Sequence, residues 1–316
     1  MGISSYLKDI GRGKAGARHL SRAHAHDLMN QLLDGQISDL ELGAFCIAMR
    51  VKGETAEELA GFLDAIHARL PCLPASTIPT VILPSYNGAR KLPVFTPLLA
   101  LLLARQGCRV WVHGQKQDPG RLTSHEVLRA IATHTPVSFP GTQDVNAIET
   151  GPGVTFFDTG SLLPGLQRLL DVRRVVGLRN SAHSLVKLIQ PVASSLLVSS
   201  YTHPEYLESM SRLFQLTGQH ALLLRGTEGE PVADPRRTPQ MTLFRDGSIQ
   251  CIEPLQAGSL SHVPDLPPGH DLAATVIYTR SVLEGDMPCP APIAQQIAHI
   301  CDAVSLHARI TSCMEH

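Results

Sequence analysis

The sequence predicts an α/β protein in which a small N-terminal helical domain precedes a larger α/β domain with a mostly parallel central sheet flanked by helices. Three observations support this prediction. A chain of 316 residues has room for two domains. Apolar residues recur at helical spacing before residue 70, and short apolar strands alternate with helices after residue 80. We therefore expect a helical domain at residues 1–75 and an α/β domain at residues 80–316.

The first seventy residues predict about four helices. A first short apolar turn is followed by the glycine-rich basic segment 11–16, which predicts a flexible link. We expect helices around residues 176–200 to complete this domain. The later helices are expected to begin after the hydroxyl residues Ser21, Ser38 and Thr55. Thr55 and Glu58 are expected to form a capping box.

Beyond residue 80 the pattern predicts a sheet built from alternating strands and helices. Residues 220–224 and 275–278 are expected to extend that sheet, and residues 255–270 to form a surface loop. The first expected strands lie at 81–83, 109–113 and 154–157, and the helices between them at 97–105 and 124–132.

The composition argues against a membrane, secreted or zinc-binding protein. No apolar run approaches the ~18 residues that span a bilayer, and the N-terminus has no apolar signal-peptide core. The seven cysteines are odd in number and show no C-x-x-C spacing, which disfavours a disulfide framework or a zinc ribbon. We therefore expect a cytoplasmic protein with no membrane partner and no metal ligands.

The net charge of −1 hides a segregation of charge along the chain. Residues 1–22, 86–129 and 168–190 hold 17 of the 27 Lys and Arg residues but only 4 of the 28 Asp and Glu residues. These segments form either three separate solvated faces or one assembled basic surface. The second alternative predicts a phosphate-rich partner such as nucleic acid.

Two loops follow predicted strands at the edge where parallel sheets bind ligands. The segment 84–91 is a small-residue turn whose backbone N–H groups can bind phosphate, with Arg90 and Lys91 adding charge. The turn 113–116 offers His113 as a hydrogen-bonding group, although a lone histidine at a strand end is more often structural. Neither motif is specific by itself.

Several stretches carry a resemblance to a known family. The segments 40–45, 48–55 and 58–61, which include Lys-Gly-Glu-Thr, resemble the helical domain of anthranilate phosphoribosyltransferase. His113-Gly114 stands where that family has Lys-His-Gly-Asn, and 173–180 resembles its Arg-Arg-Glu-Leu-Gly-x-Arg-Thr segment. The resemblance covers nearly the whole chain. It implies the nucleoside phosphorylase/phosphoribosyltransferase class III fold of glycosyltransferase family 3, and a homodimer formed through the helical domains.

The departures from the family pattern concern its substrate site. The diphosphate loop Gly-Thr-Gly-Gly-Asp is replaced by residues 86–90, Tyr-Asn-Gly-Ala-Arg, which keep one glycine and place a cation near the metal-side aspartate. The magnesium-binding Asp-Gly-x-Asp-Glu is replaced by residues 228–232, where Pro-Val stands in place of the acidic pair. The resemblance therefore implies a vestigial phosphate and substrate site, composed of Asn87, Gly88, Ala89, Arg90, Thr96, His113, Gly114 and Arg173.

The modified motifs resemble one branch of the family, the second-type anthranilate phosphoribosyltransferase-like DNA-binding proteins. This resemblance implies sequence-independent nucleic-acid binding and no anthranilate transfer. Glu228 and Glu230 are two residues apart and would point to opposite sides of an extended chain, so a charged turn is the favoured interpretation over a catalytic pair. Aromatic residues are 4% of the chain, which leaves little material for a base-stacking platform. The shared segments are 84–91, 177–183, 200–206 and 226–230.

We predict a homodimeric DNA-binding protein, with RNA as an alternative nucleic acid, no catalytic residue and no cofactor. One alternative is an active pentosyl or phosphoribosyl transferase with an altered diphosphate site, which would need Mg²⁺ and phosphoribosyl diphosphate. Another is a sensor that couples a small phosphorylated ligand to DNA binding. The predicted nucleic-acid-binding residues are Lys8, Arg12, Lys14, Arg18 and Arg22, followed by Arg90, Lys91, Lys116, Arg121, Arg179 and Lys187.

Overall fold

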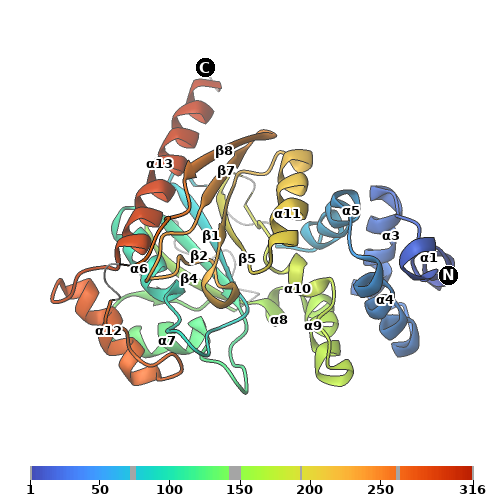
Figure 1. The fold of residues 1–316 in the computed structure, drawn as a ribbon, viewed down its shortest axis with the longest axis horizontal. Coiled ribbons are helices and arrows are strands. Elements are labelled where there is room, and N and C mark those ends of the chain that lie inside the picture. The colour runs from blue at the N-terminus through green and yellow to red at the C-terminus, as the bar shows by residue number, and fades with distance from the viewer. Residues whose placement is uncertain (1, 72–75, 142–150, 193, 261–263, 315–316) are drawn as a thin grey trace.

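The computed structural model describes residues 2–71, 76–141, 151–192, 194–260 and 264–314. A helical domain at the N-terminal end adjoins an α/β domain built on one eight-stranded sheet (Figure 1). The helices are α1 (Ser4–Ile10), α2 (Gly13–Gly16), α3 (Arg22–Leu33), α4 (Asp39–Lys52), α5 (Ala56–His67), α6 (Thr96–Arg105), α7 (Ser124–Ile131), α8 (Thr159–Leu162), α9 (Pro164–Val176), α10 (Ala182–Leu185), α11 (Pro204–Thr217), α12 (Leu272–Glu284) and α13 (Ala291–Met314), with a 3-10 turn η2 (Thr227–Gly229). Over the described residues, none of these helices is long and apolar enough to cross a membrane.

The central sheet is mostly parallel, as predicted. The strands are β1 (Thr80–Ser85), β2 (Arg109–Gly114), β3 (Val137–Ser138), β4 (Gly153–Asp158), β5 (Leu196–Tyr201), β6 (Ala221–Arg225), β7 (Met241–Arg245) and β8 (Ser248–Glu253). Their order is β3-β4-β2-β1-β5-β6-β7-β8, and the antiparallel pairs are those that β7 forms with β6 and with the edge strand β8.

Side-chain alternation along β1 explains the two layers that cover the sheet. Val81 and Leu83 belong to a core shared with α6, α7, α12 and α13, whereas Ile82 belongs to a core shared with α9, α11 and the helical domain. Successive residues of a strand point to opposite faces, so a continuous apolar strand must be covered on both.

Residues 275–278 lie within α12 and do not extend the sheet, so that expectation is wrong. Thr275, Tyr278 and Val282 are buried at spacings of three and four residues, which is the period of a helix. Asp271 caps the helix by accepting a hydrogen bond from the backbone N–H of Ala274 at 2.9 Å. Composition alone, rich in Thr, Val, Ile and Tyr, favoured a strand there.

The predicted helix starts in the N-terminal domain are confirmed. Ser21, Ser38 and Thr55 each accept a hydrogen bond from a backbone N–H of the first turn, and the last two form complete capping boxes. The helices α3 and α5 pack closely because Gly61 has no side chain. A Cβ at Gly61 would lie 2.2 Å from the carbonyl oxygen of Arg22.

Two expectations about this domain need correction. Residues 13–16 form α2, which contacts α4, so the basic segment after α1 is a helical turn rather than a flexible link. Beyond the end of α9, the described residues of the range 176–200 hold one helix, the four-residue α10, which contacts α5. Longer helices outside that range also pack on the domain, since α9 contacts α3 and α4, and α11 contacts α5.

A candidate anion-binding cleft

The loop between β1 and α6 lies at the carboxyl ends of the parallel strands, where the sequence predicted a phosphate site. Gly88 adopts a φ of +63°, and a Cβ there would lie 2.6 Å from the carbonyl oxygen of Leu122. Ala89 and Leu122 exchange two backbone hydrogen bonds of 2.9 Å. The loop is therefore fixed against the segment that leads into α7.

The carboxylate of Glu230 is buried at the base of this loop. It accepts hydrogen bonds from the backbone N–H of Gly88 at 2.8 Å and from the hydroxyl of Thr96 at 2.9 Å. The hydroxyl of Ser85 donates a third. Burial raises the pKa of Glu230, while these donors and the charge of Lys187 act in the opposite direction.

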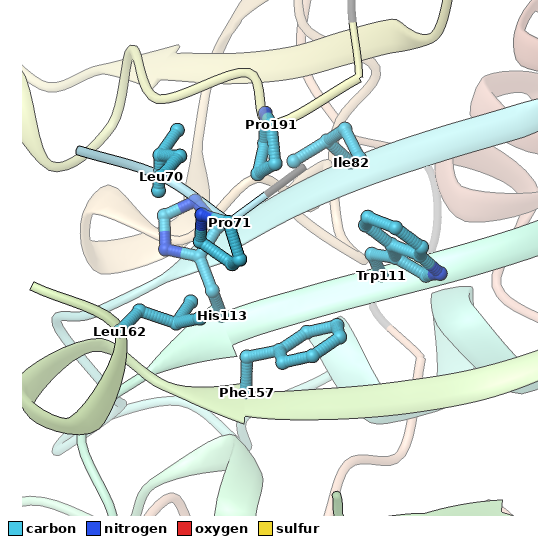
Figure 2. Close-up of a pocket in the computed structure, with 8 residues that line it drawn as sticks. All are labelled: Leu70, Pro71, Ile82, Trp111, His113, Phe157, Leu162 and Pro191. Atoms are coloured by element: carbon cyan, nitrogen blue, oxygen red, sulfur yellow. The ribbon is translucent and has the colours of Figure 1, made fainter. Parts of the chain in front are cut away.

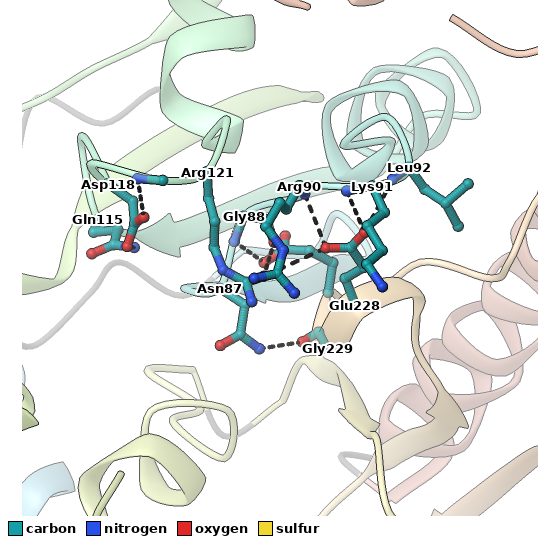
Figure 3. Close-up of polar contacts among 12 residues, drawn as sticks. Asn87, Gly88, Arg90, Lys91, Leu92, Gln115, Asp118, Arg121, Glu228 and Gly229 are labelled. Atoms are coloured by element: carbon teal, nitrogen blue, oxygen red, sulfur yellow. Dashed lines mark hydrogen bonds and ion pairs between the residues drawn. The ribbon is translucent and has the colours of Figure 1, made fainter. Parts of the chain in front are cut away.

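The carboxylate of Glu228 occupies the next part of the loop (Figure 3). It accepts from three consecutive backbone N–H groups, those of Arg90 at 2.9 Å, Lys91 at 2.6 Å and Leu92 at 3.0 Å. Arg121 Nη1 lies 3.6 Å from the same carboxylate. Three convergent N–H groups beside a cation form an anion-binding concavity, so Glu228 fills the place that a phosphate would take.

The turn that carries both carboxylates is held in an unusual backbone conformation. Glu228 has a φ of +52°, which side-chain-bearing residues rarely adopt. The Asn87 side-chain amide and the Ser200 hydroxyl both donate to the Gly229 carbonyl oxygen, at 3.0 and 2.8 Å. The left-handed residue turns both carboxylates toward the β1–α6 loop, whereas an extended chain would point them to opposite sides. Sequence reasoning missed these two residues as parts of the cleft, although their position at the altered magnesium motif was a signal.

Cations crowd the open side of the cleft. We call the side chains of Arg90, Lys91, Arg173 and Arg179 the rim; the first three residues are exposed. Arg179 donates to the Asn87 side-chain oxygen at 3.3 Å. Burial, followed by the charges of Arg173 and Arg121, lowers the pKa of Arg179. Among the described residues, no carboxylate forms an ion pair with a rim side chain. The basic segments 86–129 and 168–190 therefore meet at one site.

Lys187 is not a surface cation, contrary to its predicted role as a phosphate contact. Its side chain is largely buried beneath the turn, and burial lowers the pKa of Lys187 to about 8. Its Nζ donates to the Ser200 carbonyl oxygen at 3.4 Å. A Cβ added to Gly229 would lie 3.1 Å from this Nζ. Lys187 thus compensates the buried Glu230 charge from below.

His113 does not face the cleft turn but lines an apolar cavity between the sheet and the helical domain (Figure 2). Its neighbours there include Leu70, Trp111 and Phe157. Burial lowers the pKa of His113 to about 4, which keeps the ring neutral at pH 7. The adjacent Gly114 is required for packing, because a Cβ there would lie 2.0 Å from the Ser85 carbonyl oxygen. Both residues hold the fold together.

The Lys-Gly-Glu-Thr segment forms the junction between the two domains. Lys52 makes a buried ion pair of 2.6 Å with Glu58. Glu54 accepts a hydrogen bond from the hydroxyl of Ser181, just before α10. This motif therefore fixes the helical domain to the segment that carries Arg179.

The first basic segment begins in α1, which lies at the outer end of the helical domain (Figure 1). Lys8, Arg12 and Arg18 are exposed, and Arg18 Nη1 lies 3.9 Å from a carboxylate oxygen of Asp9. Arg22 is bound at both its Nε and Nη2 by the Asp64 carboxylate, at 2.6 and 2.8 Å. The side chain of Lys14 lies outside the described part of the structure. Within one chain, the first basic segment does not join the other two.

The residues at the altered magnesium motif do not fit a metal ion. Pro231 and Val232 have no side-chain donor atoms, and the oxygens of Glu230 are already bound by three donors. No group of three His, Cys, Asp or Glu side chains that could hold a metal occurs among the described residues. We therefore derive no chemistry through magnesium.

Comparison with known proteins relates the whole chain to one family. Residues 4–69 match the helical bundle domain of the glycosyl transferase family. The uncharacterized protein YbiB of Escherichia coli (strain K12) is 37% identical over 94% of this chain and 93% of its own length. Anthranilate phosphoribosyltransferase of Prochlorococcus marinus (strain MIT 9313) is 28% identical over 86% of this chain and 78% of its own. In structure, the anthranilate phosphoribosyltransferase of Thermus thermophilus has a TM-score of 0.67 at 18% identity, covering 96% of this chain and 94% of its own.

Proposed function

Because this chain belongs to the anthranilate phosphoribosyltransferase-like family, with the fold of glycosyltransferase family 3, we propose that it is a sequence-independent nucleic-acid-binding protein that has lost anthranilate phosphoribosyl transfer. One observation carries the proposal. The backbone donors of the β1–α6 loop, which a diphosphate would need, are bound by the carboxylates of Glu228 and Glu230.

The loss of transfer follows from competition for these donors. A diphosphate that entered the loop would have to displace Glu228 from three N–H groups and from the neighbourhood of Arg121. It would also meet the negative charge of the displaced carboxylate. Exclusion of the diphosphate removes the leaving group of the transfer reaction, so the cofactors magnesium and phosphoribosyl diphosphate have no role in this proposal.

The cations of the rim support nucleic acid as the partner. These side chains form no ion pair with a carboxylate among the described residues, so their charge is available to a polyanion. Side-chain cations contact phosphates irrespective of base sequence, and each contact releases counterions. Either DNA or RNA offers this chemistry, and we propose DNA.

An exposed apolar face supports a homodimer formed through the helical domain. Leu40, Ile47 and Val51 lie on one side of α4 and are exposed, as is Val175 at the end of α9. By contrast, Leu28, Leu32 and Phe45 are buried in the domain's own core and contribute nothing to this face. A second copy of the chain would cover the exposed face. Light scattering at micromolar concentration should give twice the mass of one chain, and a monomer would contradict the dimer.

The proposed function is tested by measuring DNA affinity across a series of salt concentrations with several unrelated duplex sequences. Backbone binding predicts that the logarithm of affinity falls linearly with the logarithm of salt, by about 0.9 per phosphate neutralised, and that all sequences bind alike. Failure to bind DNA at about 50 mM salt, or a strong preference for one sequence, would contradict the proposal.

The alternatives make different demands on the same turn. An active pentosyl or phosphoribosyl transferase would need residues 227–230 to leave the loop before phosphoribosyl diphosphate and Mg²⁺ could bind. A sensor would bind a small phosphorylated ligand there and change its DNA affinity in response. Turnover assays with phosphoribosyl diphosphate, and DNA binding with and without inorganic phosphate at constant ionic strength, separate these alternatives from the proposal.

A further inference from the structure

A second cavity, of about 230 Å³, lies beside β4 and the start of α7. The rings of His125, Phe139 and Phe156 line it and contact one another. Their centroids are 5.0 Å apart for His125 and Phe156, 5.7 Å for His125 and Phe139, and 6.2 Å for the two phenylalanines. A chain with only 4% aromatic residues thus gathers rings at one cavity, which the composition did not indicate.

Cations border the same cavity. The guanidinium carbon of Arg129 lies 4.6 Å from the ring centroid of Phe139, and Arg129 is exposed with no ion pair to any described carboxylate. Lys116 is also exposed, and its Nζ lies 3.5 Å from a carboxylate oxygen of Asp158, a residue that lines the cavity as well. The histidine ring is fixed by a hydrogen bond of 3.1 Å between its Nδ1 and the Lys116 carbonyl oxygen. Burial and these cations lower the pKa of His125, which favours a neutral ring.

The cavity is small for a whole ligand but large enough for one planar ring. Binding sites for drug-sized molecules enclose about 300–1,000 Å³. Aromatic walls stack any nucleobase irrespective of its identity, and adjacent cations meet the attached phosphate. Arg129 has no carboxylate partner among the described residues, so the combination favours a ring that carries a negative group.

We propose that this cavity binds one unstacked nucleobase, with the phosphate of that nucleotide held by Lys116 and Arg129. The inference rests on the proposed nucleic-acid function and sharpens it, because a base is available for stacking in a single strand and is paired in a duplex. The protein therefore prefers single-stranded to duplex nucleic acid of the same sequence. A free nucleoside monophosphate offers the same chemistry, and the experiment separates the two sources.

The experiment compares four proteins: wild type, Phe139→Leu, Arg129→Gln, and Arg212→Gln as the matched control. Arg212 is an exposed arginine on α11 that is paired with Glu208 and lies on another element. Each protein is titrated with a single-stranded 12-mer that contains 2-aminopurine, with the corresponding duplex, and with dAMP. Affinity is measured by anisotropy, and stacking by 2-aminopurine fluorescence.

The inference predicts that Phe139→Leu weakens single-strand binding about tenfold, in line with the loss of one stacked base, and leaves duplex binding unchanged. Arg129→Gln should show a smaller effect in the same direction, and Arg212→Gln none. Equal losses on single strand and duplex, or no loss from Phe139→Leu, would overturn the base site. If wild type binds neither DNA form, the proposed function fails. The titration with dAMP then decides the inference. If wild type binds dAMP and Phe139→Leu does not, the cavity is a nucleotide site; if wild type does not bind dAMP, the inference is refuted.

Discussion

The two basic regions of this protein differ in what surrounds their cations. In the N-terminal segment, Arg22 is bound by Asp64 through two hydrogen bonds, and Arg18 lies near Asp9. At the rim of the cleft, burial and then the charges of Arg179 and Arg173 lower the pKa of His183 to about 3, and the charge of Arg173 helps to lower the pKa of Arg179. One region neutralises its cations locally, and the other concentrates them.

The positions of charged side chains in the folded structure, rather than their order along the chain, therefore determine where a basic surface forms. Residues 1–22 contain five Lys or Arg residues and one acidic residue, yet part of their positive charge is already compensated by carboxylates. The rim is assembled from two distant segments and faces a loop whose backbone donors are occupied. Binding at such a site depends on side-chain charge, which suits a polyanion, rather than on a backbone cradle, which suits a single phosphate group.

Removing the rim charge should have the largest effect on DNA binding. Replacing Arg90, Lys91, Arg173 and Arg179 with Gln should lower affinity roughly 100-fold at low salt and flatten the salt dependence by about 3 to 4 in log–log slope. A control replaces four arginines that have carboxylate partners, of which Arg212 and Arg236 are exposed and Arg168 and Arg280 are partly exposed. If the control loses as much affinity as the rim variant, net charge rather than the rim determines binding.

Replacing His113 separates residues that hold the fold from residues that bind. The pKa of His113 is about 4 in the folded protein and about 6.5 when unfolded, so the unfolded chain takes up the proton first as pH falls. Folding stability is therefore complete above about pH 6.5 and decreases toward about pH 4. The free energy of unfolding, measured with denaturant, should fall between about pH 7 and 4.5 in both proteins. The fall should be smaller for His113→Leu than for wild type by about 2 to 3 kcal/mol.

DNA affinity at neutral pH should not change in this variant, since His113 lines a cavity away from the rim. His183, whose pKa is also lowered, remains in both proteins and leaves part of the acid sensitivity intact. If the variant lost as much stability on acidification as wild type, His113 would not be buried as a neutral ring.

Glu228→Ala tests the filled loop directly. The variant leaves three backbone N–H groups without their acceptor, which should reduce the free energy of unfolding by about 1 to 3 kcal/mol. Inorganic phosphate should then raise the melting temperature of the variant more than that of wild type, because the anion replaces the lost carboxylate. Glu208→Ala, which removes an exposed carboxylate from α11, is the control. An equal phosphate effect on all three proteins would contradict this account.

The N-terminal cations should matter least. Replacing Lys8, Arg12, Lys14, Arg18 and Arg22 with Ala should weaken DNA binding by roughly tenfold or less and flatten the salt slope by about 2, since two of them already face carboxylates. Anisotropy titrations across salt provide the measurement. A larger loss than that of the rim variant would reverse the order of the two regions.

Much of the fold could be predicted from local patterns. Hydroxyl caps at Ser38 and Thr55 fix helix starts through contacts three residues away, and buried strands such as 81–83 appear as continuous apolar runs. The failure at 275–278 arose where residue types favoured a strand and only the spacing of buried positions distinguishes a helix. Local signals are therefore reliable where the contact that decides the structure is itself local.

The content of the cleft could not be predicted from the sequence. Asn87, Gly88 and Thr96 lie in or directly after the β1–α6 loop, and their partners come from a turn up to 142 residues later. The direction of the two carboxylates depends on the left-handed conformation of Glu228, which spacing along an extended chain does not reveal. The burial of Lys187 likewise follows from tertiary packing rather than from its neighbours in sequence.

Calorimetric titration of the wild-type protein with phosphoribosyl diphosphate and Mg²⁺, run beside a titration with DNA, tests the central claim most directly. If Glu228 and Glu230 occupy the diphosphate position, the protein gives no saturable heat with phosphoribosyl diphosphate at concentrations up to about 1 mM, and a clear isotherm with DNA. Saturable, Mg²⁺-dependent binding at micromolar concentration would contradict the claim that the loop is filled by the chain's own carboxylates.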